Sequence, residues 1–264
     1  MALPITKGPK AGRCNICGQH GRLTADHVPP KGTLRFPRMV LNSITDALNA
    51  EPPARNKGRI FQNGVKFNSL CERCNRDVLG TLYDPELVAF ANAVSKYLHS
   101  SVILPNIGSF SIKPGLIARA IAGHILAIGV EQFPRGDMGE AMAEMVLAPN
   151  SPMPEKLKMY YWLYPYWDQV SIRGCGYLVR WGAPPLVISV LKFMPLAFMV
   201  AWDVDPRLNI PHANLIDFAA GRGAESVNVP VNFVDVPHQR YPEAPRSEGA
   251  VLHGSESYLA ERKK

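Results

Sequence analysis

The amino-acid sequence predicts an α+β fold, in which a short cysteine-bearing segment precedes a longer region of helices and antiparallel strands. Two C-x-x-C pairs enclose residues 14–74. Apolar residues then recur at helical spacing between residues 84 and 147. Residues 157–203 consist of runs rich in Tyr, Val, Ile, Phe and Trp that are separated by Gly and Pro, which is typical of an antiparallel meander.

The apolar spacing predicts helices first and strands later in the chain. Pro85 and Pro114 suit the first turn of a helix, which does not need the N–H group that proline lacks. The helices are expected at residues 84–99, 115–130 and 137–147, and the strands at 64–70, 158–166, 170–181 and 186–202.

Changes in composition divide the chain into four parts. Residues 1–13 form a basic lead-in that we expect to be flexible. Residues 14–83 form the cysteine-bearing module, and residues 84–236 form an α+β region with the helices and the meander. Residues 237–264 are polar and rich in Pro, Glu, Arg and Ser, so we expect a disordered tail.

The charge and hydropathy of the chain limit its partners and its location. The net charge of +7 and the sequence pI of about 9.2 favour acidic partners, of which nucleic acid is the commonest. The most apolar window, residues 187–202, contains Lys192 and Pro195 and is shorter than the roughly 20 residues that a membrane-spanning helix needs. We therefore expect a soluble, cytoplasmic protein that does not enter a membrane.

Four of the cysteines are arranged as ligands for one metal ion. Cys14 and Cys17 form the first C-x-x-C pair, and Cys71 and Cys74 form the second. Two such turns supply four thiolates, which complete the tetrahedron of a structural zinc site. The alternative is that one or both pairs are redox dithiols. A redox C-x-x-C motif usually occurs once, beside a βαβ unit, and the sequence predicts no such unit here. Cys175 stands between two glycines and is expected to be a small buried residue.

The segments CNICG, ADHVPPK and LCERCN follow one another in this order along the chain. In residues and order they resemble the zinc-bearing members of the HNH (ββα-metal) endonuclease superfamily, and the resemblance covers about residues 14–90. It implies a ββα-metal fold, hydrolysis of phosphodiester bonds and one catalytic divalent metal. It also implies a restriction, defence or mobile-element setting, and it places Asn75 at the start of the helix that follows the second strand.

The residues of these segments suit phosphodiester hydrolysis. His27 can take a proton from water, and Asp26 offers a hard anionic oxygen to Mg²⁺ or Mn²⁺. Asn75 offers a neutral carbonyl oxygen to the same ion. Neighbouring residues on a strand face opposite sides, so Asp26 and His27 need a twist or bulge to act together. The competing interpretation is an ordinary surface histidine beside an acidic turn residue.

One position departs from the family pattern. Lys66 stands where the family has its middle asparagine, and a lysine cannot accept hydrogen bonds as an amide does. Asn68, two residues further along the same strand face, is the expected substitute, and Asn63 is a weaker one. The departure favours a second hypothesis, a non-catalytic zinc-binding module that grips nucleic acid or a protein partner.

Basic residues near these segments are candidates for phosphate contacts. Such contacts position a nucleic acid without reading its sequence, and a solvated basic face is the alternative for any one of them. DNA is the expected substrate, and RNA is the alternative. The candidates are Lys31, Arg35, Arg38, Lys66, Arg73 and Arg76.

The longer C-terminal region carries no comparable motif. We expect its tyrosines and tryptophans at 160–167 to pack in the core and not to stack on bases. His124 lies in an apolar helix and is expected to be an interior histidine with satisfied hydrogen bonds. We hypothesise that this region selects the substrate, forms a homo-oligomer or binds a partner protein.

Overall fold

Helices and antiparallel sheets make up the fold, as the sequence predicts. The computed structural model describes residues 4–33, 37–49, 58–62, 64–133, 135–178, 185–219, 225–244 and 249–263. Every strand pairing within these residues is antiparallel. The α+β prediction is therefore confirmed.

A small sheet carries the cysteine pairs and runs into a helix. It has the order β1 (Ala11–Arg13), β2 (His20–His27) and β5 (Lys66–Cys71). A π-helix, η1 (Arg73–Tyr83), follows β5 almost at once and continues into the α-helix α2 (Asp84–Leu98). This strand–strand–helix order is the one that the resemblance implied.

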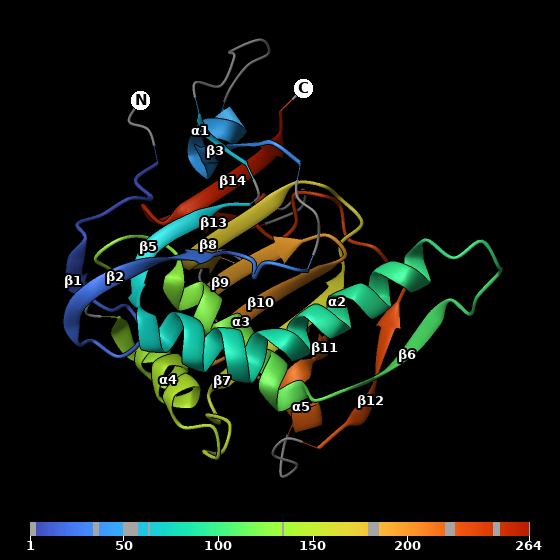
Figure 1. Ribbon diagram of the computed structural model, residues 1–264. Coiled ribbons are helices and arrows are strands. Elements are labelled where there is room, and N and C mark those ends of the chain that lie inside the picture. Colours follow the sequence, from blue (N-terminus) through green and yellow to red (C-terminus); the bar gives the residue numbers. More distant parts are fainter. Residues whose placement is uncertain are drawn as a thin grey trace.

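A large sheet forms the other half of the molecule (Figure 1). It contains the expected meander, and the apolar run at 186–202 turns back at Met194 and Pro195 to give two strands. The order is β11 (Ala213–Asn214), β7 (Leu157–Leu163), β10 (Leu196–Trp202), β9 (Leu186–Phe193), β8 (Gln169–Leu178), β14 (Ser257–Arg262), β3 (Met39–Ser43) and β4 (Arg59–Phe61), with β13 (Ala250–Leu252) also paired to β8.

Three predicted boundaries differ from the structure. Residues 1–13 are expected to be a flexible lead-in, yet Ala11–Arg13 form β1 and pair with β2, and Thr6 is buried. The tail after residue 237 was expected to be disordered, yet β14 lies inside the large sheet between β8 and β3. Its short buried run at 257–260 is too brief to change the polar average of the tail. The pairing of β3 with β14 also ties the cysteine-bearing segment to the large sheet, so residues 14–83 are not a separate structural unit.

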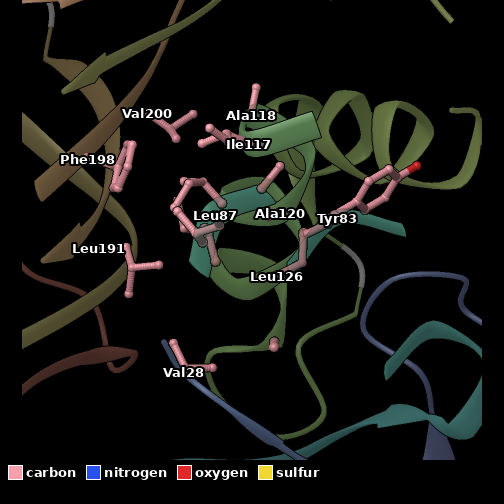
Figure 2. Packing of buried hydrophobic residues seen from close by; sticks show 14 of the residues in the cluster. Val28, Tyr83, Leu87, Ile117, Ala118, Ala120, Leu126, Leu191, Phe198 and Val200 are labelled. Carbon is pink, nitrogen blue, oxygen red and sulfur yellow. The ribbon is translucent and has the colours of Figure 1, made fainter. Parts of the chain in front are cut away.

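The helix α3 (Pro114–Ala127) lies at the centre of the molecule. Almost every residue of α3 is buried, and it contacts α2, η1, β2, β5, β8 and β9. Figure 2 shows its apolar residues Ile117, Ala118 and Ala120 among side chains of the large sheet and of α2. One core cluster therefore joins the small sheet to the large one. The predicted helices at 84–99, 115–130 and 137–147 correspond to α2, α3 and α4 (Gly136–Leu147).

Shorter elements complete the fold. The helix α1 (Ile44–Asn49) follows β3, and α5 (Leu215–Ala219) packs beside α3. A two-stranded sheet joins β6 (Ile107–Ile112) to β12 (Val227–Asn232). None of the helices that the structure describes combines the length and the apolar character that a membrane crossing requires.

Five of the six aromatic residues at 160–167 pack in or against the core, as expected, whereas Trp167 is 42% exposed. Tyr161, Trp162 and Tyr164 are buried. The ring of His212 stacks on Trp162 with 4.7 Å between ring centroids, and Tyr241 meets the His212 ring edge-on. Burial lowers the pKa of His212 to about 4. This histidine therefore favours its neutral form in the folded protein.

We expect His212 to make the protein less stable in acid. The pKa of His212 is about 4 in the folded protein and about 6.5 in the unfolded chain. Between these two pH values the unfolded chain binds a proton that the folded protein does not, so the free energy of unfolding is unaffected above pH 6.5 and decreases as the pH falls from 6.5 to about 4. The loss is at most about 3 kcal/mol in free energy of unfolding. Urea unfolding at pH 7 and pH 4.5 should show a smaller acid loss for His212→Phe than for wild type or for a His20→Phe control on the exposed part of β2. An unchanged acid loss in His212→Phe would contradict this account.

Candidate active site

The four cysteines converge on one point. Cys14 and Cys17 lie in the turn between β1 and β2, and Cys71 and Cys74 lie where β5 runs into η1. Their sulfur atoms all lie within 4.8 Å of one another, and Cys17 Sγ lies 3.8 Å from Cys71 Sγ. Sulfurs at 2.3 Å from a tetrahedral zinc are separated by about 3.8 Å, and none of the four forms a disulfide. The arrangement fits a structural zinc ion.

In the absence of a cation, the four thiols oppose one another's ionisation. A hydrogen bond from Cys74 lowers the pKa of Cys14 to about 5, whereas burial raises the pKa of Cys17 to about 11. A single thiolate is thus favoured, and its negative charge opposes further ionisation of its neighbours. A bound dication removes this conflict, because zinc takes its cysteines as thiolates.

The first cysteine turn is fastened to the end of α3. The last carbonyl groups of a helix lack partners within that helix. Here Asn15 Nδ2 donates to the carbonyl oxygens of Leu126 and Gly129, at 3.1 Å each. Ser69 Oγ, on β5, donates to the carbonyl oxygen of Ala127 at 2.7 Å. The cysteine-bearing segment therefore holds α3 in place directly.

A pocket of about 550 Å³ opens beside the cysteine site, between β2, η1 and the start of α2. The predicted base, His27, and the predicted ligands of the catalytic metal, Asp26 and Asn75, all line this pocket. Its polar side chains belong to Thr24, Asp26, His27, Lys31, Glu72, Asn75, Arg76 and Asp84. The structure thus brings Asp26, His27 and Asn75 to one cavity, with Lys31 and Arg76 at its wall.

Asp26 is the most deeply placed of these groups. Its side chain is only 5% exposed, and its Oδ2 atom lies 3.0 Å from His124 Nδ1. Burial raises the pKa of Asp26, and the neighbouring His124 opposes that rise. The pairing of β2 with β5 shifts register between Thr24 and Ala25, where β5 carries the extra residue Ser69, and it is regular at Asp26 and His27. The bulge that these two residues were expected to need does not lie between them; His27 instead lies at the end of the strand.

His27 ends β2 and is half-buried. Burial, together with the positive charges of Lys66 and Lys31, lowers the pKa of His27 to about 4. The imidazole is therefore unprotonated at neutral pH, which is the form that can accept a proton.

Asn75 is oriented by β2. Its Nδ2 atom donates to Thr24 Oγ1 at 2.9 Å and to the carbonyl oxygen of Ala25 at 3.2 Å. These bonds use the amide nitrogen and leave Asn75 Oδ1 without a hydrogen-bond partner among the residues that the structure describes. A carbonyl oxygen held in this way suits a hard divalent cation.

The catalytic divalent ion that the resemblance implies, in addition to zinc, would need oxygen ligands and water. Within the described ranges, the four cysteines are the one group of three or more His, Cys, Asp or Glu side chains that could hold an ion by themselves. Magnesium keeps several waters and accepts one or two protein oxygens, so Asp26 and Asn75 fit its preferences.

Most of the other predicted residues do not line the pocket. Lys66 lies directly opposite His27 in the pairing of β2 with β5, and Asn68 lies opposite Ala25. Neither side chain lines the pocket, so Asn68 does not stand where the missing asparagine would act. Arg38 and Arg73 also lie outside the lining, and Arg76 pairs with Glu72 and Asp77. Arg35 and Asn63 fall outside the described residues.

The sequence did not indicate two residues of the site. His124, completely buried in α3, bridges Asp26 to Asp84, with 2.8 Å between His124 Nε2 and Asp84 Oδ1. Asp84 is the first residue of α2 and lines the pocket. The signal in the sequence that pointed to His124 was its position in a mainly apolar helix, where it is the one histidine.

In comparisons with known proteins, no protein-family model, curated protein or solved structure matches the chain.

Proposed function

We propose that this protein is a metal-dependent endonuclease of the HNH type that hydrolyses phosphodiester bonds in DNA. One observation carries the proposal: Asp26 and His27 from β2 and Asn75 from η1 line a single pocket beside a four-cysteine metal site. These are the residue types, in the strand–strand–helix order, on which the resemblance to that superfamily depends.

Each residue has a distinct role in the proposed reaction. His27 accepts the proton of the attacking water, since its imidazole is neutral and reaches the pocket. Asp26 and Asn75 Oδ1 would hold Mg²⁺ or Mn²⁺. The bound cation supplies counter-charge to the phosphate and to the leaving oxygen. Zinc in the four-cysteine site has no open position, so its role is structural.

Positive charge supports a nucleic-acid substrate. The chain has a net charge of +7, and Lys31 lines the pocket close to His27. A lysine there can contact a phosphate of the bound strand, but it carries no information about sequence.

A plasmid-nicking assay tests the proposal. Zinc-loaded protein should relax supercoiled DNA with Mg²⁺ or Mn²⁺ and should stop when EDTA is added under conditions that leave the zinc bound. Asp26→Asn should lose this activity. Cleavage of RNA but not of DNA would change the substrate class and retain the chemistry. Folded, zinc-loaded protein that cuts neither nucleic acid with any of these metals would reject the enzyme.

The second candidate is a non-catalytic zinc-binding module. Lys66, opposite His27, favours it, because no amide steadies the base from that position. This candidate predicts salt-dependent DNA binding that is unaffected by Asp26→Asn and is not accompanied by cleavage.

A further inference from the structure

A fully buried histidine joins two carboxylates of the pocket. His124 comes from α3, and its side chain is 0% exposed. Its Nδ1 atom lies 3.0 Å from Asp26 Oδ2, and its Nε2 atom lies 2.8 Å from Asp84 Oδ1. Both ring nitrogens thus lie within hydrogen-bond distance of a carboxylate oxygen, so the imidazole is held at both ends.

The position of His124 is fixed from several sides. Around it, α3 is buried along nearly its whole length. One residue earlier, a Cβ atom added to Gly123 would lie 2.2 Å from Leu79 Cδ2, so α3 lies very close to η1. Asn15 and Ser69 hold the carbonyl groups at the end of the same helix. The imidazole therefore has little freedom to move away from Asp26.

We infer that His124 is a positioning residue: it fixes the Asp26 carboxylate for the catalytic metal and is itself anchored by Asp84. The inference deepens the proposed function and rests on it. His124 contacts Asp26 through Oδ2, and because the histidine is itself held in the core, this contact restrains the position of the carboxylate. Asp84 lines the pocket as well, so the anchor lies at the site and not behind it.

A hydrogen bond that orients a metal ligand has a measurable effect on metal binding. Removal of a group that orients a metal ligand typically costs 10- to 100-fold in affinity. A residue that only fills the core has no such specific effect, although its loss lowers stability. Metal affinity measured directly therefore separates positioning from packing.

Two substitutions of His124 test its contacts with Asp26 and Asp84 separately. An asparagine amide nitrogen lies as many bonds from the backbone as Nδ1, so His124→Asn can keep the contact with Asp26. A glutamine amide nitrogen corresponds to Nε2, so His124→Gln can keep only the contact with Asp84. Ile125→Val, a small change in the buried neighbour on α3, is the control for lost packing.

The readout is Mn²⁺ affinity, measured by electron paramagnetic resonance on zinc-loaded protein, with zinc content and thermal midpoint recorded for each variant. We expect 10- to 100-fold weaker Mn²⁺ binding for His124→Gln, and affinity within about threefold of wild type for His124→Asn and Ile125→Val. High Mn²⁺ should partly restore nicking by His124→Gln. Equal losses in the Asn and Gln variants, or no loss in the Gln variant, would overturn the inference.

Asp26→Asn separates this inference from the function on which it rests. If Mn²⁺ binding depends on Asp26 but not on His124, only the positioning role fails. If wild type and Asp26→Asn bind Mn²⁺ equally, the proposed metal site fails, and the positioning role fails with it.

Discussion

His27→Ala is expected to slow plasmid nicking by roughly 10²- to 10⁴-fold, which is the usual contribution of a general base. His27 ends β2 in the pocket, and its neutral imidazole is the group there that can take a proton from water. Alanine removes the proton acceptor and leaves Asp26 and Asn75 in place. The measurement is the initial rate of nicking at saturating Mg²⁺ or Mn²⁺.

Two further measurements make this result specific. His20→Ala changes an exposed histidine at the other end of the same strand, and it should nick DNA at the wild-type rate. His27→Ala should also keep its zinc and its Mn²⁺ affinity, because His27 is proposed as the base and not as a ligand. A nicking rate within about threefold of wild type would show that His27 is not the base.

Cys74→Ala is expected to abolish stoichiometric zinc binding and to lower the free energy of unfolding by several kcal/mol. Cys74 is completely buried and belongs to the four-cysteine site. Binding free energy of a structural zinc is also folding free energy, and for zinc-finger peptides it amounts to about 10–16 kcal/mol. Because a large core remains in this protein, we expect partial destabilisation of the fold.

The effect of Cys74→Ala should extend beyond the cysteines. The first cysteine turn holds the end of α3 through Asn15, and α3 carries His124. Loss of zinc should therefore weaken Mn²⁺ binding at the pocket as well. Cys175→Ala is the matched control, since Cys175 is buried in β8 outside the site. Metal analysis and urea unfolding in reductant are the measurements, and a full equivalent of zinc in Cys74→Ala would contradict the assignment.

Local patterns in the sequence predicted the elements that depend on local spacing. The C-x-x-C turns specify four ligands by spacing alone, and the structure brings their sulfurs together. The apolar periodicity similarly predicted α2, α3 and α4. In both cases, the signal lies in residues a few positions apart.

Features that depend on distant contacts were not predicted. β14 is a strand because β3 and β8 supply its hydrogen-bond partners, and no local average reveals those partners. The contact between His124 and Asp26 joins residues 98 positions apart. Only the packing of α3 against the small sheet makes that pair, so the sequence showed a lone interior histidine without its role.

We propose that Asp26 and Asn75 hold one divalent cation beside His27, and anomalous diffraction from Mn²⁺-soaked crystals can locate that ion. We expect a manganese peak in the pocket within coordination distance of Asp26 and of Asn75 Oδ1, and a separate zinc peak among the four cysteines. Crystals that show the zinc peak but no manganese in contact with Asp26 at saturating Mn²⁺ would contradict it.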